Sequence, residues 1–413
     1  MMLDVYLHTR LVGHLTDTGR GLTFRYAVDW LEHRECFPIS QSLPLSADEQ
    51  DEGLSTGWFW NLLPEDDQLR VFASRLGLHP GEIFALLRRM GRETAGALCI
   101  GGPEHPGRYL LRSPAELAED IAGLPARPLH AGEDEVTLSL AGAQSKMAVA
   151  LFDDRIHLPQ NGAASTHILK PDSQRLYASV ENEALCMRLA KAVGVDTPNV
   201  QLGIAEGYRY LLIERYDRKR REDGFVDRLH QEDSAQALGI PPTRKYEASG
   251  GPGLSALFAL IDAASTQLVE DRLALLDRVI FNAAVGNTDA HAKNFSFMIS
   301  PDGHRLAPLY DVLSAGMYHG ITENLAMKIG SARSRRYIFK EDWQEFANQA
   351  GLGPAATLRQ VDRLCRKILE HLPATADELI QDPAARPDAV RLFSNAIQEQ
   401  TERTLRNAQL GRS

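Results

Sequence analysis

Cysteines are few in this sequence and lie far apart. The 413 residues contain four, namely Cys36, Cys99, Cys186 and Cys365. No two of them form a C-x-x-C pair, so the sequence indicates neither a disulfide framework nor a thiolate metal site. We expect all four to be reduced side chains in the core of a cytoplasmic protein.

Long apolar runs and an excess of basic residues are also absent. No run of eighteen uncharged apolar residues occurs, which argues against a transmembrane helix and a membrane partner. Asp4 makes the N-terminus a poor signal peptide. The formal net charge is −10, so strong direct binding to nucleic acid is disfavoured. We interpret the basic stretch Arg215–Arg221 as a solvated loop, with contact to a partner as the alternative.

The apolar pattern changes several times along the chain and predicts an α+β protein. Alternating segments at 5–7 and 22–26 predict a small sheet, and a helical period follows at 81–89. Further strands are predicted at 136–140, 147–152, 167–170 and 210–213, and further helices at 181–193, 254–261 and 271–284. The predicted regions are a β-rich module at 1–105, a connection at 106–130, a strand-rich lobe at 131–225 and a mainly helical lobe at 226–413.

The most informative motif is 287–294, which reads N-T-D-A-H-A-K-N. It follows an apolar helical segment that ends at Gly286, and Asp289 and Asn294 stand five positions apart. This is the D-x-x-x-x-N spacing of protein-kinase catalytic loops. In those loops the Asp accepts the hydrogen of the attacking hydroxyl and the Asn holds a metal ion. The spacing by itself occurs by chance in many proteins.

A second carboxylate downstream strengthens the interpretation. Strand-like segments at 295–299 and 304–307 flank a turn signal and lead directly to Asp311. A hairpin there returns the carboxylate of Asp311 to the vicinity of Asp289. Oxygen ligands from Asn294 and Asp311 suit Mg²⁺, which takes its other ligands from water and phosphate. The alternative is an Asx-rich loop that only caps helices and turns.

Two further side chains of the motif are candidate catalytic residues. No H-E-x-x-H or Cys/His cluster supports zinc binding at His291, so we expect this histidine to support the loop through hydrogen bonds. Lys293 is placed to meet the γ-phosphate of ATP and to offset developing charge, and a solvated lysine is the alternative.

A turn of small residues precedes the motif by about 150 positions. Small side chains let backbone N–H groups approach phosphates closely. With one glycine, the turn matches neither G-x-G-x-x-G nor the Walker pattern, and an ordinary hairpin is the alternative. The candidate phosphate-binding residues are Ala141, Gly142, Ala143, Gln144, Ser145 and Lys146.

Lys170 ends a predicted strand, as the nucleotide-binding lysine of kinases ends V-A-I-K. Glu183 or Glu181 in the next predicted helix could pair with it and orient its ammonium group towards the α- and β-phosphates of ATP. The alternative is a surface lysine. The segment 210–216 fits a hinge whose backbone pairs with adenine, with Glu214 and Tyr216 as candidate contacts.

The sequence resembles the HipA family of toxin kinases from bacterial toxin–antitoxin modules. The matching stretches follow one another in order across nearly the whole chain, and two of them precede the kinase region. They are 61–65, 91–98, 139–146, 166–170, 181–183, 214–217, 231–233, 286–294 and 310–315.

This resemblance implies a fold, a chemistry and a set of partners. The fold is a bilobal Ser/Thr protein-kinase fold related to phosphoinositide kinases. Asp289 is implied as the catalytic residue, Asn294 and Asp311 as Mg²⁺ ligands, and Lys170 with the loop 141–146 as ATP contacts. The implied partner is a HipB-like helix-turn-helix antitoxin, through which the kinase reaches operator DNA. The implied substrate belongs to the translation machinery, such as an aminoacyl-tRNA synthetase.

Ser139 matches the serine that this family autophosphorylates. The resemblance implies that modification ejects the loop and inactivates the enzyme, because a phosphoserine adds negative charge beside the ATP phosphates. The alternative is a strand-end hydroxyl without a regulatory role. Two features fit the HipA pattern but depart from ordinary eukaryotic-type kinases: His291 replaces a lysine, and the phosphate loop is poor in glycine.

Two rival functions share the same catalytic residues. One is a small-molecule phosphotransferase, such as an aminoglycoside or choline kinase, although the N-terminal module favours a protein partner. The other is a catalytically silent corepressor that binds ATP only to stabilise an antitoxin complex. The presence of Asp289, Asn294 and Asp311 argues against it.

Overall fold

The computed structural model describes residues 1–124, 144–318 and 320–411. The chain forms two compact units, and it enters each of them three times. Unit 1 comprises Met1–Pro171, Ile204–Thr243 and Phe297–His304, and unit 2 comprises Asp172–Gly203, Arg244–Ser296 and Arg305–Ser413. The predicted region limits at residues 105, 130 and 225 follow the sequence pattern and stay predictions.

Unit 1 begins with a four-stranded antiparallel sheet in the order β3-β2-β1-β4. Alternate residues such as Val5, Leu15 and Phe24 are fully buried, because a strand with one covered face points every second side chain into the core. The strands predicted at 5–7 and 22–26 and the helix predicted at 81–89 are confirmed. The elements are β1 (Met2–Leu7), β2 (Arg10–Asp17), β3 (Leu22–Tyr26), β4 (Leu98–Ile100), α1 (Val28–Leu31), α2 (Glu52–Trp60), α3 (Asp66–Arg75) and α4 (Ile83–Met90).

A six-stranded sheet follows in the order β5-β7-β6-β8-β10-β9. Helix α5 (Pro114–Gly123) begins with a capping box between Ser113 and Glu116, which satisfies two of its first N–H groups. Leu117 and Ile121 of α5 share a core cluster with Leu169. The strands predicted at 147–152, 167–170 and 210–213 are confirmed. They belong to β5 (Arg108–Leu111), β6 (Met147–Phe152), β7 (Arg155–Gln160), β8 (His167–Pro171), β9 (Val200–Ala205) and β10 (Tyr208–Glu214). The strand predicted at 136–140 lies outside the described residues.

Short strands after β10 complete unit 1. The hairpin predicted between 295 and 307 is confirmed as β14 and β15, which form one sheet in the order β13-β14-β15. Residues 297–304 of this hairpin group with unit 1, and both of its ends belong to unit 2. The elements are β11 (Arg218–Arg220), β12 (Val226–Arg228), β13 (His230–Asp233), α7 (Ser234–Ala237), β14 (Ser296–Ser300) and β15 (Gly303–Leu306).

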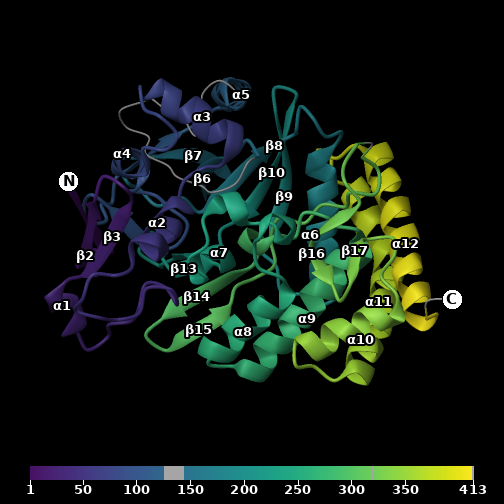
Figure 1. Cartoon of the computed structure of the whole chain (residues 1–413). Coiled ribbons are helices and arrows are strands. Elements are labelled where there is room, and N and C mark those ends of the chain that lie inside the picture. Colours follow the sequence, from purple (N-terminus) through teal and green to yellow (C-terminus); the bar gives the residue numbers. More distant parts are fainter. Residues whose placement is uncertain (125–143, 319, 412–413) are drawn as a thin grey trace. The chain divides into compact units, whose positions relative to one another are not determined.

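Unit 2 is mainly helical. Helices α11 and α12 run side by side at the yellow end of the chain in Figure 1, and both also contact α6 and α9. The helices predicted at 181–193, 254–261 and 271–284 are confirmed, whereas the short hairpin β16–β17 was not predicted. No helix in the described ranges is both long and apolar enough to cross a lipid bilayer. The elements are α6 (Ser179–Ala192), α8 (Leu254–Ala264), α9 (Leu268–Val285), β16 (Asn324–Ile329), β17 (Ala332–Ser334), α10 (Lys340–Gln349), α11 (Pro354–Ile380) and α12 (Pro387–Gln409).

The expected cysteine chemistry agrees with this fold. All four cysteines are free, and Cys99, Cys186 and Cys365 are buried, whereas Cys36 is half-buried. Burial raises the pKa of the Cys186 and Cys365 thiols to about 12. These two side chains are therefore uncharged packing groups rather than nucleophiles.

Candidate active site

The candidate catalytic loop begins where α9 ends, at Gly286. Its φ angle of 78° lies in the left-handed region that favours glycine. The N–H groups of Gly286 and Asn287 both donate to the carbonyl of Asn282. A β-carbon at position 286 would lie 3.2 Å from Cγ of Gln400. The backbone conformation therefore favours glycine here, and a larger residue would also press on the Gln400 side chain.

Hydrogen bonds within the loop fix the backbone around Asp289. The Asn287 side chain donates to Asn282 Oδ1 over 2.8 Å and accepts the Asp289 N–H over 3.0 Å. The carbonyl of Asp289 accepts from the His291 N–H over 2.8 Å and from Asn294 Nδ2 over 2.9 Å. Asp289 is nevertheless exposed. A carboxylate on a fixed backbone that solvent reaches is suited to meet an incoming hydroxyl group.

Asn294 lies in the short 3-10 helix Ala292–Asn294 and is buried. Because its amide nitrogen donates to the Asp289 carbonyl, its amide oxygen is the atom available to a cation. This donor set fits Mg²⁺, which binds one or two protein oxygens together with phosphates and water. Clusters of three or more His, Cys, Asp or Glu side chains that could hold a metal do not occur in the part of the chain described.

The β14–β15 hairpin joins the catalytic loop to the segment that carries Asp311. At its base, the Ala307 N–H donates to the Ser296 carbonyl over 2.8 Å. The Tyr310 hydroxyl donates to the Lys293 carbonyl over 2.6 Å and shares a 2.6 Å hydrogen bond with Ser296 Oγ. Lys293 directly precedes Asn294, and Tyr310 directly precedes Asp311. The segments that carry the two predicted metal ligands are therefore linked at the base of the hairpin and through the Tyr310 side chain.

Asp311 has a φ angle of 58°, which is uncommon for a residue with a β-carbon. Asp and Asn tolerate this left-handed conformation better than other such residues. The segment that follows is held by Asn182 of α6, which donates to the Ser314 carbonyl and accepts the Ser314 N–H, both over 2.9 Å. A strained residue whose neighbours are fixed on both sides is typical of functional sites.

His291 and Lys293 are both buried, each with 6% of its surface exposed. The alternative of a solvated lysine at position 293 is therefore wrong. The His291 ring meets the Tyr246 ring edge to face, with the centroids 5.1 Å apart. Tyr246 also donates to Asp289 Oδ1 over 2.9 Å, and the sequence analysis did not identify it. Tyr246 lies about forty residues before Asp289 and belongs to no motif, so the sequence pattern gave no indication of this contact.

Lys170 is the last but one residue of β8, which continues to Pro171; it lies opposite Leu211 of β10 and is 6% exposed. The alternative of a surface lysine is therefore wrong. Glu181, one of its two predicted partners, binds Arg386 through contacts of 2.8 and 2.6 Å. Glu183 is buried in α6 and stays the predicted partner of Lys170.

The predicted adenine hinge, residues 210–216, consists of most of β10 and the two residues after it. This strand lies between β8 and β9, so its backbone has a hydrogen-bonded neighbour on each side. Glu214 is the last residue of β10 and pairs with His167 of β8, whereas Tyr216 lies past the end of the strand, and the contact of both with adenine stays a prediction. Glu214 is exposed, and the Tyr216 hydroxyl donates to the Gln231 side chain.

The phosphate loop is described only in its last three residues. Gln144, Ser145 and Lys146 are half-buried and lead directly into β6. Their proposed contact with ATP stays a prediction. The other predicted members, Ala141, Gly142 and Ala143, lie outside the described residues, and so does Ser139.

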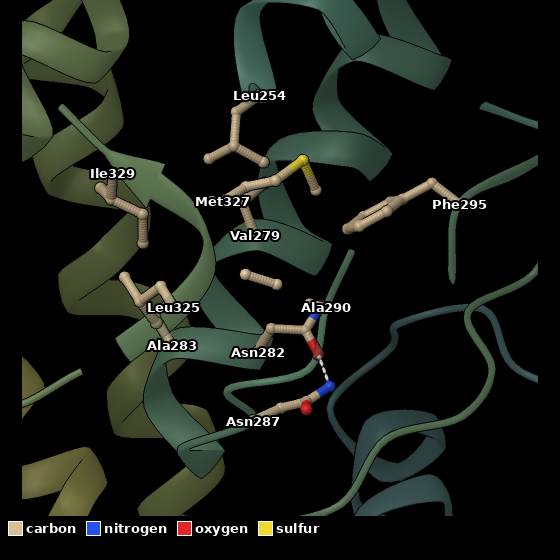
Figure 2. A pocket seen from close by; sticks show the side chains of 11 residues that line it. Leu254, Val279, Asn282, Ala283, Asn287, Ala290, Phe295, Leu325, Met327 and Ile329 are labelled. Atoms are coloured by element: carbon tan, nitrogen blue, oxygen red, sulfur yellow. Dashed lines mark hydrogen bonds between the residues drawn. The ribbon is translucent and has the colours of Figure 1, made fainter. Parts of the chain in front are cut away.

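A small cavity lies against the catalytic loop in unit 2 (Figure 2). Ala290 of the loop lines it, together with Asn282 and Asn287 at one end and apolar side chains such as Val279 and Met327. Figure 2 shows the hydrogen bond between the two asparagines at that end. Its volume of about 20 Å³ holds one water molecule, whereas nucleotide pockets measure hundreds of cubic ångströms. This cavity is therefore too small to hold a nucleotide.

Family models match most of the chain. One, described as the HipA N-terminal domain, matches residues 3–101, and another, described as the HipA-like C-terminal domain, matches residues 138–375. The chain belongs to the HipA family.

Individual relatives agree with this family assignment. The protein Y4mE of Sinorhizobium fredii is 41% identical over 88% of this chain and 89% of its own length. The serine/threonine-protein kinase toxin HipA of Shewanella oneidensis is 31% identical over 89% of this chain and 88% of its own. A solved complex of Shewanella oneidensis HipA, HipB and operator DNA matches with a TM-score of 0.87 and 28% identity over 98% of both chains. The predicted α+β kinase-like fold is thereby confirmed.

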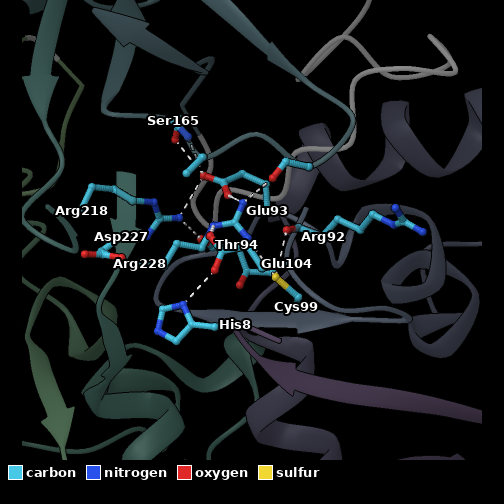
Figure 3. A network of polar contacts seen from close by, with 12 residues as sticks. His8, Arg92, Glu93, Thr94, Cys99, Glu104, Ser165, Arg218, Asp227 and Arg228 are labelled. Carbon is cyan, nitrogen blue, oxygen red and sulfur yellow. Dashed lines mark hydrogen bonds and ion pairs between the residues drawn. The ribbon is translucent and has the colours of Figure 1, made fainter. Parts of the chain in front are cut away.

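Two HipA-like stretches, 91–98 and 214–217, meet away from the candidate catalytic loop, in a buried ion cluster of unit 1 (Figure 3). Glu93 accepts from Arg215 over 3.0 Å and from Arg218 over 2.9 Å, and it pairs with Arg228 over 2.5 Å. Asp217 bridges Arg215 and Arg218 at 2.8 and 3.1 Å. The five side chains are at most 3% exposed. These motif residues therefore hold the N-terminal module to the strands after β10.

This cluster corrects the interpretation of the basic stretch 215–221. Arg215 and Arg218 are buried within the cluster rather than solvated or presented to a partner, and the exposed members are Lys219, Arg220 and Arg221. Burial by itself would raise the pKa of Glu93, but the three arginines lower it to about 2. The Glu93 carboxylate is therefore charged at neutral pH despite its burial.

Glu232 provides a second buried link within unit 1, and it predicts a pH effect. Its carboxylate accepts from the Gln41 N–H and from Trp58 Nε1, both over 3.0 Å. Burial raises the pKa of Glu232 from 4.5 to about 7. A carboxyl group with a raised folded-state pKa stabilises the fold most below pH 4.5, and that contribution disappears as the pH rises to 7. Between pH 4.5 and 7, we expect the free energy of unfolding of wild type to fall by roughly 2–3 kcal/mol more than that of Glu232→Gln.

Urea denaturation of wild type and Glu232→Gln at pH 4.5, 5.5, 6.5 and 7.5 measures this difference. The Glu206→Gln variant serves as the control, because Glu206 lies in the exposed turn between β9 and β10. Its free energy of unfolding should change with pH as that of wild type does. Parallel pH dependence in wild type and Glu232→Gln would show that Glu232 does not titrate in this range.

Proposed function

We propose that this HipA-family chain is an ATP- and Mg²⁺-dependent serine/threonine protein kinase that acts as the toxin of a HipBA-like module. One observation carries the proposal. Asp289, Asn294 and the Tyr310–Asp311 segment are joined by hydrogen bonds into one structure, with the Asp289 side chain open to solvent. The relative from Shewanella oneidensis that is named a kinase toxin supports the same activity.

In this proposal the chain's own residues divide the work of phosphoryl transfer. Asp289 orients the attacking hydroxyl and accepts its hydrogen. Asn294 Oδ1 and the Asp311 carboxylate hold Mg²⁺, which when bound neutralises charge on the ATP phosphates. Lys293 and Lys170, both buried, place ammonium groups where the phosphates carry charge. Glu183 orients Lys170, Gln144–Lys146 approach the phosphates, and Glu214 and Tyr216 border the adenine.

The proposed partners follow from the chemistry and from the solved relative. That relative is seen with HipB and operator DNA, so we assign a HipB-like antitoxin to this chain. The net charge of −10 favours contact with DNA mainly through the antitoxin. The proposed substrate is a protein of the translation machinery such as an aminoacyl-tRNA synthetase, and Ser139 is the proposed autophosphorylation site. The enzyme is assigned to the cytoplasm, where its free cysteines stay reduced.

Labelled ATP added to a lysate of the host cell tests the proposal. Purified protein with Mg²⁺ should label itself and a cellular protein, and EDTA should prevent both. Transfer to small molecules without protein label would identify a small-molecule phosphotransferase instead. ATP binding without any transfer would identify a silent corepressor.

Substitutions at Asp311 separate its chemical role from its conformational one. Asparagine tolerates the left-handed conformation, so Asp311→Asn should keep the wild-type melting temperature while transfer falls about 100-fold or more, because a charged Mg²⁺ ligand is lost. Asp311→Ala should lose the same activity and also about 1 kcal/mol of stability. Rates of label transfer and thermal unfolding measure the two effects. Full activity in Asp311→Asn would remove Asp311 from the metal site.

A further inference from the structure

A tyrosine that belongs to none of the motifs touches the proposed catalytic carboxylate. The Tyr246 hydroxyl donates to Asp289 Oδ1 over 2.9 Å, and its ring packs edge to face on His291 with a centroid separation of 5.1 Å. One side chain thus contacts two of the loop's predicted catalytic residues. A phenol offers a carboxylate the same O–H donor that a substrate serine or threonine offers.

The segment that carries Tyr246 is itself fixed to unit 2. We call residues 244–251 the strap. On the N-terminal side of the tyrosine, the Lys245 carbonyl accepts the N–H of Ala292 in the catalytic loop. On the other side, Glu247 accepts the Lys328 N–H over 2.7 Å and pairs with Lys328 Nζ over 2.9 Å. Since Lys328 belongs to β16, the strap connects the candidate catalytic loop to the β16–β17 hairpin.

The strap also closes on itself around Tyr246. The Tyr246 carbonyl accepts the N–H groups of Ser249 and Gly251, over 3.0 and 2.9 Å. A β-carbon at position 251 would lie 2.1 Å from the Arg244 carbonyl oxygen, so this turn requires glycine. The backbone of Tyr246 therefore has little freedom, and its hydroxyl reaches Asp289 from a defined direction.

We propose that Tyr246 is a positioning residue for phosphoryl transfer, which binds Oδ1 of the Asp289 carboxylate and helps to orient this carboxylate towards the substrate hydroxyl. This inference rests on the proposed kinase function. The carboxylate of an exposed aspartate can adopt more than one orientation about its last torsion, because water can replace a hydrogen bond that it loses. A fixed phenolic donor selects one orientation in advance, and small errors in the placement of reacting groups lower rates by large factors.

The geometry also defines a competing role for the same hydroxyl. If Tyr246 occupied the substrate's place, it would have to leave before a serine or threonine could bind. Removal of its hydroxyl would then increase the transfer rate. Removal of a positioning group lowers the maximum rate and leaves ATP binding unchanged, because no atom of Tyr246 is assigned to the nucleotide. The two roles therefore predict opposite changes in rate.

The Tyr246→Phe variant of the full chain tests the inference, because it keeps the ring on His291 and removes only the donor. The measurement is total protein-bound label from labelled ATP in host lysate, followed at several ATP concentrations. We expect the maximum rate to fall about 10- to 100-fold, with a half-saturating ATP concentration within twofold of wild type and an unchanged melting temperature. Glu247→Gln, which loosens the strap without touching Asp289, should give a smaller loss of the same kind.

Tyr337→Phe is the matched control, since Tyr337 is 63% exposed in the same unit and should leave the rate unchanged. A Tyr246→Phe rate equal to or above wild type would overturn the inference, and so would a rate loss that only follows a lowered melting temperature. An inactive wild-type protein would overturn the proposed function and this inference with it. An active wild type with an unaffected variant would overturn the inference alone.

Discussion

Replacing Asp289 by alanine is expected to reduce phosphoryl transfer at least 1000-fold, to background. Removal of a general base typically costs 10²- to 10⁴-fold in rate, and Asp289 also orients the substrate hydroxyl. The fold should remain intact, because the side chain is exposed and the loop is held by backbone and asparagine hydrogen bonds. The loss would therefore report on chemistry rather than on stability.

Incubation with labelled ATP and Mg²⁺, followed by mapping of the labelled residue, measures this effect. Wild type should carry label on Ser139 and Asp289→Ala should carry none. Asp289→Asn keeps an oxygen that can accept from Tyr246 and should be equally inactive, which separates the charge from the hydrogen bond. The control is Asp302→Asn, at the exposed turn of the β14–β15 hairpin. Equal labelling of wild type and Asp289→Ala would reject the assignment of the catalytic residue.

The second large effect is expected on stability, from Glu93→Gln. The substitution keeps the size of the side chain but removes the negative charge that Arg215, Arg218 and Arg228 share. Breaking a buried ion network by removing one partner typically costs about 3–5 kcal/mol, because a buried charge is left uncompensated. Urea denaturation at pH 7 should show a loss of this size. Activity per folded molecule should change little.

The same variant has a defined pH dependence. The folded-state pKa of Glu93 is lowered from 4.5 to about 2. Its contribution is therefore complete above pH 4.5 and disappears as the pH falls towards 2. The stability difference between wild type and Glu93→Gln should shrink across this interval. Asp67→Asn, at a surface pair with Arg70 whose side chains are 63% and 72% exposed, should cost less than about 1 kcal/mol. A comparable cost in both variants would contradict the special role of the buried cluster.

The HipA motifs divide into two groups when they are placed in the structure. The stretches 286–294 and 310–315 build the candidate active site, and Asn182 holds the second of them. The stretches 91–98 and 214–217 meet in the ion cluster, and Glu232 binds the N-terminal module. A motif shared with a family therefore does not by itself distinguish chemistry from architecture. The two roles can be told apart only from the contacts that each side chain makes in the structure.

Much of the local structure could be predicted from the sequence. Strands such as β6 and β8 and helices such as α9 follow from the spacing of apolar residues, because that period fixes which face an element buries. The end of α9 at Gly286 was also predictable, since glycine favours the left-handed cap. The short strands β16 and β17 were missed, because segments of three to six residues carry too little period to separate strand from loop.

The sequence by itself determined the family, the D-x-x-x-x-N spacing of Asp289 and Asn294, and the hairpin that leads to Asp311. These features are local along the chain, or are short motifs that keep their order. Only the tertiary structure decided that Arg215 and Arg218 are buried, that Glu181 binds Arg386, and that Tyr246 reaches Asp289. Each of these depends on residues far apart in sequence becoming neighbours, and burial and charge pairing are properties of that three-dimensional neighbourhood rather than of residue type.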